Sequence, residues 1–361
     1  MIKINFITPK SEKITGVIRY INEISKRLEK KVVFNKIEYN VGNFKQDTNK
    51  ILSALRAINK LFKFAKEVKA RVEKNTITHI VAHDLAYLLN FIPLEKTIVT
   101  CYDLMHLVYY RKRFSPFWQL NIKGLKKADR IITISNFSKN EIVKCLKYSK
   151  DKIDVIHPGV DYNRYYQKRS KEILKRYNIS ENKKIILYVG SEHPRQNVPF
   201  LIKGFAELKK VLPGTKLLKI GNPQWPGARE KLEKLIRKLN LKNDVVFLGY
   251  IPEEELPKFY NAADLFVYPC LYAGFGIPLL EAMACGVPVI TSNLTSLPEV
   301  VGTAGKTIDP LNQKELTEAM YNVLTNEILR EEMIIKGLER AKIFTWEKSA
   351  QQTLEVYNKM K

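Results

Sequence analysis

The sequence predicts an α/β protein with two doubly wound parallel sheets. Short apolar runs, which read as buried strands, alternate with helical patterns along the whole chain. Such alternation is typical of parallel sheets covered by helices. The runs form two series on either side of a polar stretch at 161–184, and 361 residues suffice for two domains with separate cores. We therefore expect two Rossmann-like domains facing across a cleft, with a ligand at the carboxyl ends of the strands.

The first series lies within the first 165 residues. A strand is expected at 2–6, and an amphipathic helix at 17–28 follows the turn at Thr15 and Gly16. Gly16 lies between the first strand and the first helix, a position that favours contact with a phosphate group. Apolar runs bounded by helical patterns predict further strands at 80–82, 97–101, 131–134 and 154–156.

The second series follows the polar stretch. Its strands are expected at 185–190, 217–220, 245–248, 265–268 and 287–290. A last helix at 346–360 has no strand after it.

The stretch 272–290 is the most informative part of the chain. Gly274 and Gly276 leave a loop whose backbone can approach a ligand closely. Pro278 then begins a helix, because its fixed φ suits the first turn, and Gly286 ends that helix after about two turns. A glycine loop before a helix N-terminus binds anions, because unpaired N–H groups and the positive end of the helix dipole both face the ligand.

Glu281, one turn into this helix, suits the hydroxyls of a ribose. The stretch therefore predicts a site for a nucleoside diphosphate. The alternative is a short buried helix after an ordinary turn, with Glu281 stabilised only by the helix dipole.

Composition excludes several classes of protein. A hydrophobic content of 45% excludes a disordered chain, and no apolar run approaches the roughly 18 residues of a membrane span. The N-terminus lacks the pattern of a signal peptide. Four scattered cysteines are interpreted as reduced structural thiols of a cytoplasmic protein that bind no metal: Cys101, Cys145, Cys270 and Cys285.

The charge is uneven along the chain. Residues 1–165 contain 32 Lys and Arg against 15 Asp and Glu, a net of +17, which leaves +7 of the total of +24 for the rest. Such asymmetry indicates a polyanionic partner for the first half. Nucleic acid, an anionic membrane and a phosphate-bearing substrate all qualify, but no nucleic-acid-binding motif is present.

Five further segments have recognisable patterns, at 128–138, 156–161, 188–197, 296–300 and 344–347. Their order and spacing resemble the retaining glycosyltransferases of the GT-B fold, of the group 1 or family 4 type. The glycine loop is similar to that family's donor-site signature, E-G-F-G-x-P-x-x-E. The resemblance implies that Glu281 is the second glutamate and holds the donor ribose, whereas Ala273 stands in place of the first.

The resemblance also implies an organisation and an activity. Residues 1–165 would form an acceptor-binding domain, 166–345 a nucleotide-sugar-binding domain, and 346–361 a helix that crosses back to the first domain. The protein would move a mannose- or glucose-type hexose from a GDP- or UDP-linked donor to a glycan or lipid-linked acceptor, with retention of configuration. We expect no cofactor and no metal, since the chain lacks a D-x-D motif.

The residues expected to contact the donor sugar nucleotide come from both series of strands. Catalysis is assigned to Arg195, whose planar fork suits a diphosphate, and to Tyr102 and Asp103 at a strand end. Tyr102 replaces a family histidine, and Gln196 replaces a family lysine. His106, one turn beyond Tyr102, is an alternative to the missing histidine or an ordinary structural residue. The full donor set is Gly16, Arg195, Gln196, Ala273, Gly274, Phe275, Gly276, Ile277 and Glu281.

Two stretches are candidates for contact with the acceptor or with a membrane. The loop with Arg111, Lys112, Arg113, Phe117 and Trp118 mixes cations with aromatic rings, which suits a headgroup interface. A basic amphipathic helix at 51–72 either lies on a membrane or packs on the core with a solvated face. Peripheral contact with the inner membrane face is expected.

Two rival functions remain open. The departures at Ala273, Tyr102 and Gln196 also fit a non-catalytic sugar-nucleotide-binding partner of an active enzyme. A nucleic-acid-binding protein is favoured by charge alone.

Overall fold

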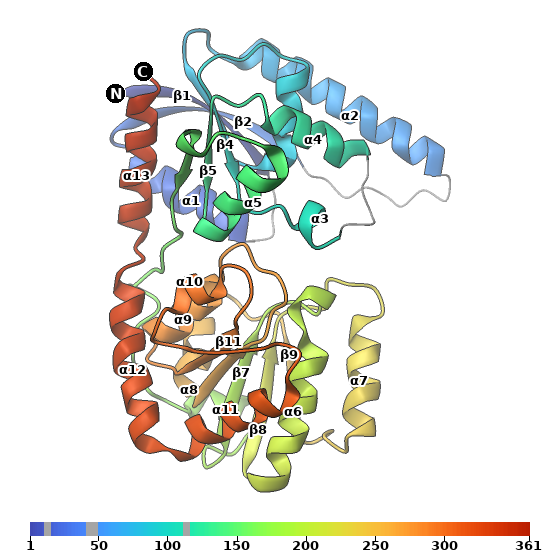
Figure 1. Cartoon of the computed structure of the whole chain (residues 1–361), viewed down its shortest axis with the longest axis vertical. Helices are drawn as coiled ribbons and strands as arrows, with labels where there is room; N and C mark the ends of the chain where they lie inside the picture. Colours follow the sequence, from blue (N-terminus) through green and yellow to red (C-terminus); the bar gives the residue numbers. More distant parts are fainter. Residues whose placement is uncertain (11–15, 41–49, 111–115) are drawn as a thin grey trace. The chain divides into compact units, whose positions relative to one another are not determined.

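A computed structural model shows the chain as two compact α/β units. It describes residues 1–10, 16–40, 50–110 and 116–361, without the side chains of 50–58. The first unit comprises Met1–Pro158 and Trp346–Lys361, and the second comprises Gly159–Thr345 (Figure 1). Each unit carries its own six-stranded parallel sheet with packed helices, which confirms the predicted doubly wound α/β class.

The sheet of the first unit has the order β2-β1-β3-β4-β5-β6. Ile80 of β3 pairs with Val99 of β4, so these neighbouring strands end close together at the carboxyl edge. The strands are β1 (Ile2–Lys10), β2 (Val32–Asn40), β3 (Ile77–Ile80), β4 (Thr97–Cys101), β5 (Arg130–Thr133) and β6 (Ile153–Val155).

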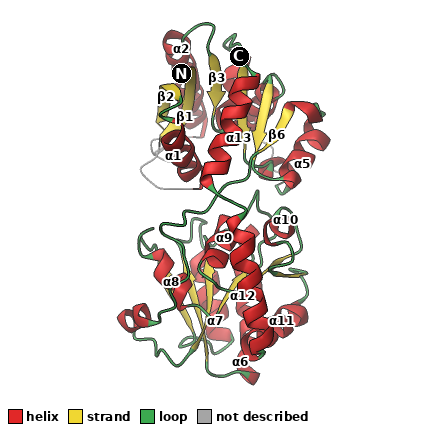
Figure 2. Cartoon of the chain, turned by 90° about the vertical axis from the view of Figure 1, so that its left-hand side faces the viewer, coloured by secondary structure: helices red, strands yellow, loops and turns green. Residues whose placement is uncertain are grey.

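The C-terminal helix α13 (Trp346–Lys359) belongs to the first unit, where it lies beside α1 (Figures 1 and 2). Arg27 of α1 donates to Glu347 at 2.7 Å, and the rings of Tyr20 and Trp346 meet edge to face at 6.0 Å. The other helices of this unit are α1 (Gly16–Leu28), α2 (Lys50–Arg71), η1 (His83–Asn90), α3 (Met105–Val108), α4 (Pro116–Leu125), α5 (Asn136–Leu146) and η2 (Lys150–Lys152).

The sheet of the second unit has the order β12-β11-β10-β7-β8-β9. Its strands are β7 (Lys184–Val189), β8 (Thr215–Ile220), β9 (Val245–Gly249), β10 (Leu265–Tyr268), β11 (Val289–Ser292) and β12 (Lys306–Ile308). Its helices are η3 (Glu172–Tyr177), η4 (Pro194–Gln196), α6 (Val198–Val211), α7 (Ala228–Lys238), α8 (Leu256–Ala262), α9 (Ile277–Ala284), α10 (Leu297–Val301), α11 (Gln313–Thr325) and α12 (Glu327–Lys342).

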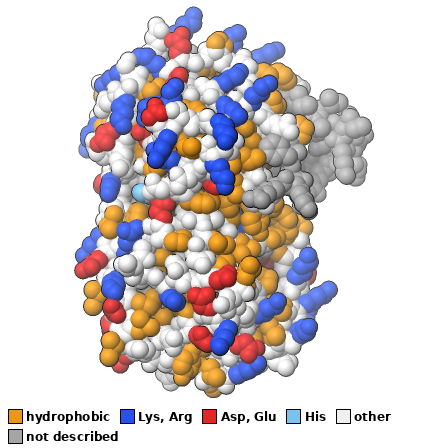
Figure 3. Space-filling view, in the orientation of Figure 1, with side chains coloured by type: hydrophobic (Ala, Val, Ile, Leu, Met, Phe, Trp, Pro, Cys, Tyr) orange, Lys and Arg blue, Asp and Glu red, His pale blue; other side chains and the backbone are white. Residues whose placement is uncertain are grey.

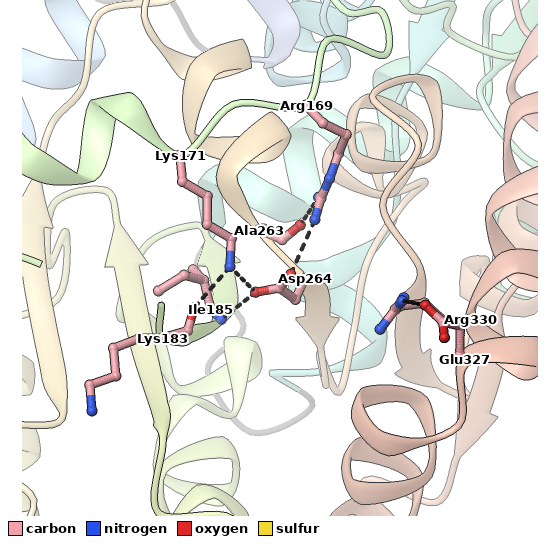
Figure 4. A network of polar contacts seen from close by, with 8 residues as sticks. All are labelled: Arg169, Lys171, Lys183, Ile185, Ala263, Asp264, Glu327 and Arg330. Carbon is pink, nitrogen blue, oxygen red and sulfur yellow. Dashed lines mark hydrogen bonds and ion pairs between the residues drawn. The ribbon is translucent and has the colours of Figure 1, made fainter. Parts of the chain in front are cut away.

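Asp264 ties together the amino ends of β7 and β10 (Figure 4). Its carboxylate accepts from the backbone N–H of Ile185 at 2.8 Å, from Lys171 Nζ at 2.9 Å and from Arg169 Nη2 at 3.1 Å. Lys171 Nζ also donates to the carbonyl of Lys183 at 2.8 Å. This network fixes the two strands relative to each other, and their opposite ends carry the loops described below.

The edges of the sheets differ from the sequence prediction. The edge strands β2 and β12 were not expected, because only Val32 and Ile37 of β2 are buried and β12 has only three residues. The strand expected at 287–290 begins instead at Val289. Helix α2 packs Phe64, Ala65 and Val68 into the core and leaves Phe62, Lys63 and Lys66 exposed. All four cysteines are free, as interpreted.

Two observations bear on possible partners. Among the described residues, no helix is both long enough and apolar enough to cross a membrane. On the face drawn in Figure 3, the Lys and Arg side chains are spread over both units and do not gather into one patch.

Candidate functional site

The glycine loop connects β10 to α9 in the second unit. Gly276 is the N-cap of α9 with φ of 119°, and a Cβ there would lie 2.9 Å from a methyl carbon of Leu297. Both the backbone conformation and the space therefore require glycine. Pro278 lies in the first turn, and the N–H of Ile277 has no acceptor within the helix. The predicted loop and two-turn helix are thus present.

Side chains that follow β11 hold this loop in place. The Ser296 hydroxyl lies 2.9 Å from the carbonyl oxygens of both Ala273 and Phe275, and Thr295 Oγ1 accepts from the Ala273 N–H at 3.3 Å. Ala273 itself is buried. Because the Ser296 hydroxyl bonds loop carbonyls and the Thr295 hydroxyl accepts from a loop N–H, the backbone is fixed without a charged side chain at position 273.

Arg195 braces the same loop from η4. Its Nη1 donates to the carbonyl of Tyr272 at 3.0 Å, and its own carbonyl accepts from the N–H of Leu271 at 2.7 Å. Gln196 is buried beside Tyr268, whose pKa is raised by burial although a hydrogen bond with Gln196 lowers it in part. The structure therefore brings Arg195 and Gln196 together with the glycine loop.

Glu281 lies inside α9 and is 2% exposed. The Tyr260 hydroxyl donates to its Oε2 at 2.8 Å. The pKa of Tyr260 is raised well above its ordinary value, first by burial and then by the negative charge of Glu281. Tyr260 is therefore a constant donor that fixes the orientation of this carboxylate.

A buried ion cluster near the Arg195 loop was missed by the sequence reasoning. Glu192 accepts from Lys219 Nζ at 2.8 Å and from Arg229 Nε at 2.9 Å, and the Glu192 and Lys219 side chains are 0% and 2% exposed. Burial opposes ionisation of Glu192, but these two cations hold its pKa below the ordinary value. The cluster fixes the segment between β7 and Arg195. The lysine within the otherwise apolar end of β8 was the available signal.

In the first unit, Tyr102 and Asp103 directly follow β4. The Tyr102 hydroxyl donates to the carbonyl of Val81 at 2.9 Å, and its buried ring meets Tyr20 edge to face at 5.5 Å. Asp103 Oδ1 accepts from the N–H of Met105 at the start of α3. Tyr102 thus links the ends of β3 and β4 and packs on α1.

Two imidazoles contact one indole at the same edge of this sheet. The ring of His106 stacks on Trp118 at 4.1 Å and 24°, and the ring of His83 lies 5.6 Å from Trp118. His83 Nε2 lies 3.4 Å from Asp84 Oδ1. Burial lowers the pKa of His106, whereas the charges of Asp84 and Asp103 raise it. His83 was missed because it joins this cluster only through the pairing of β3 with β4.

The remaining expected residues are less informative. Gly16 begins α1 and is exposed, and no atom of the described residues lies within 4 Å of the position of a Cβ. Phe117 packs against Tyr87 at 6.1 Å. Arg111, Lys112 and Arg113 lie outside the described residues.

Two family models match the chain. Residues 169–340 match the model for glycosyl transferases group 1, and residues 14–164 match the model for glycosyltransferase family 4. A curated relative, O-antigen chain mannosyltransferase B of Escherichia coli, is 31% identical over 98% of this chain and 99% of its own length. A serotype-specific mannosyltransferase of Escherichia coli is 26% identical over 78% of this chain, and the match spans 37% of that relative.

Solved structures share the architecture. Sucrose-phosphate synthase from Thermosynechococcus elongatus has a TM-score of 0.80 with 21% identity over 99% of both chains. Anabaena HepE in complex with UDP and glucose has a TM-score of 0.82 with 17% identity, covering 99% of this chain and 100% of its own. At these identities the likeness extends to the fold alone.

Proposed function

This chain belongs to the group 1 and family 4 glycosyltransferases of the GT-B fold, and from this premise we propose how it works as a hexosyltransferase. It transfers a hexose of the mannose or glucose type from a nucleotide-diphosphate sugar to a glycan or lipid-linked acceptor, and it retains the anomeric configuration. The observation that carries the proposal is the glycine loop held at the N-terminus of α9. Mannose is favoured by the relative that aligns along its full length.

The donor diphosphate binds the backbone N–H groups of residues 274–277. These groups lie at the positive end of the α9 dipole, and the Ser296 and Arg195 contacts hold them in place before the ligand arrives. Glu281 accepts from a ribose hydroxyl, because Tyr260 keeps its carboxylate in one orientation. The base is guanine or uracil, and the sequence favours neither.

The reaction breaks the bond between the anomeric carbon and the diphosphate. Its transition state resembles an oxocarbenium ion leaving a dianion, so donors that are already in place for the diphosphate lower the barrier. Arg195 contributes by keeping the loop rigid and by placing a positive charge beside it. Gln196 makes an uncharged contact with the diphosphate at the position where the family pattern has a lysine. The transfer needs no metal, since N–H groups and Arg195 meet the leaving group.

Binding of nucleoside diphosphates tests this donor site. Titration calorimetry with GDP and UDP should give a dissociation constant for one of them that Glu281→Ala raises about tenfold or more, since a charge-assisted hydrogen bond contributes roughly 1.5–3 kcal/mol. Glu318→Ala, on an exposed face of the same unit, is the matched control and should bind like the parent. Equal affinity of the parent and Glu281→Ala would remove Glu281 from the site.

We propose that the acceptor lies at the cytoplasmic face of a membrane. Phe62 and Phe91 of the first unit are 47% and 42% exposed with ring centroids 5.0 Å apart, and Lys63 and Lys66 lie exposed beside Phe62 on α2. Exposed aromatic rings flanked by cations suit an anionic interface. Replacing both rings by serine should reduce sedimentation with phosphatidylglycerol vesicles, whereas Val33→Ser, at an exposed position of β2, should not. Equal sedimentation of all three proteins would refute membrane contact through these two rings.

A further inference from the structure

The cluster of His83, His106 and Trp118 has the composition of a ligand site. Its residues come from three elements, η1, α3 and α4, which meet at the carboxyl ends of β3 and β4. Ligands of doubly wound sheets bind at this edge. Asp103 follows β4 at the same edge, so the cluster lies beside a residue already assigned to the reaction.

The hydrogen-bonding capacity of His83 is only partly used within the cluster. Its side chain is 13% exposed, and its Nδ1 is buried without a hydrogen-bond partner among the described residues. A buried polar atom without a partner is destabilising and calls for a functional explanation. Its other nitrogen faces Asp84, whose side chain is 61% exposed and thus open to a ligand.

The electrostatics of the cluster favour a neutral ligand. Burial lowers the pKa of His106, so its ring is uncharged at neutral pH, with one N–H donor and one nitrogen acceptor. Asp84 and Asp103 both act on this ring electrostatically and would repel a phosphate. A sugar hydroxyl both donates and accepts, and it therefore matches this set of groups.

We propose that His83 and His106 bind the hydroxyl groups of the acceptor sugar, with Asp84 as a further acceptor for the same ring. Trp118 holds His106 in position by stacking and packs against the ring of His83 at a tilt. The first unit thereby selects a neutral glycan end and excludes a phosphorylated one. This inference rests on the proposed transferase activity, because it names the second substrate of that reaction.

Phenylalanine substitutions separate binding from packing. His83→Phe and His106→Phe retain a ring against Trp118 but remove the nitrogens. With octyl α-mannoside as the acceptor probe, each variant should raise the acceptor KM about tenfold, the effect of one lost hydrogen bond. In His83→Phe, the donor dissociation constant and the slow hydrolysis of donor without acceptor should stay as in the parent. Gln119→Ala, at an exposed position of α4, is the control.

Each outcome decides between the two proposals. Normal donor binding and hydrolysis with an unchanged acceptor KM in both variants would overturn the acceptor assignment alone. A parent protein that neither binds nor hydrolyses any donor would overturn the proposed function instead. In that case saturation-transfer NMR with methyl α-mannoside still tests the site, since the signal should fall in both histidine variants and persist in Gln119→Ala. A signal that persists in all of them would refute the inference.

Discussion

Acidification should destabilise the first unit through His79. This histidine lies in β3 with no exposed surface, and its ring nitrogens lie 2.7 Å from the Tyr357 hydroxyl and 2.8 Å from the Thr100 hydroxyl. Tyr357 belongs to α13, so the contact ties the C-terminal helix to the sheet of this unit. Burial lowers the pKa of His79 from 6.5 to about 3.

The sign and size of the effect follow from proton linkage. In the unfolded chain His79 is protonated below pH 6.5, whereas in the folded chain it is protonated only below about pH 3. The contribution of neutral His79 to the free energy of unfolding is therefore complete above pH 6.5 and is lost as the pH falls towards 3. One pKa unit corresponds to 1.36 kcal/mol, so the step from pH 7 to pH 5 should cost about 2 kcal/mol.

Urea unfolding at pH 7 and pH 5 measures this cost. Trp118 and Trp346 lie in the first unit and Trp225 in the second, so Trp225→Phe makes fluorescence report on the first unit. His79→Gln should reduce the pH dependence by about 2 kcal/mol relative to the parent. Tyr357→Phe is the matched control, since it removes a partner hydroxyl but keeps the buried imidazole. An identical pH dependence in the parent and His79→Gln would refute the reasoning.

Three other perturbations probe the second unit. Asp264→Ala should cost about 1–2 kcal/mol in urea unfolding, because it removes the acceptor of the Ile185 N–H and the ion-pair partner of the partly exposed Lys171 and Arg169, and a loss below about 0.5 kcal/mol would show that the network is dispensable. Ala273→Glu should lower turnover, since the buried alanine leaves no room for an unpaired carboxylate, and a gain in turnover would reveal a degenerate site. A chelator should leave transfer intact, and inhibition reversed by Mg²⁺ would contradict a metal-free mechanism.

Apart from β3, which was expected at 80–82 and lies at Ile77–Ile80, the central strands and the glycine loop could be predicted because local sequence determines both. Strands such as β10, Leu265–Tyr268, are buried along their whole length and therefore appear as continuous apolar runs. The turn at Gly276 needs a backbone that only glycine adopts easily, and Pro278 marks the helix start. The edge strand β2 carries Lys36 and Glu38 among its nine residues and lacks such a run.

The side-chain clusters could not be predicted, because residues far apart in sequence form them. Glu192 and Lys219 meet because β7 pairs with β8, and His83 and His106 meet because β3 pairs with β4. The role of Arg195 at the diphosphate stays a prediction, and the sequence could not give the bond from its Nη1 to the loop carbonyl of Tyr272. A motif gives the type of residue at a site but not the direction of its side chain.

The stereochemistry of the product tests the central claim most directly. The enzyme would be incubated with the nucleotide-linked hexose that it binds and with octyl α-mannoside, and the one-bond C1–H1 coupling of the new linkage would be measured by NMR. Retaining transfer from an α-linked donor predicts an α-linked disaccharide. A β-linked product would contradict the retaining mechanism, and the absence of any disaccharide with every donor that binds would contradict transfer itself.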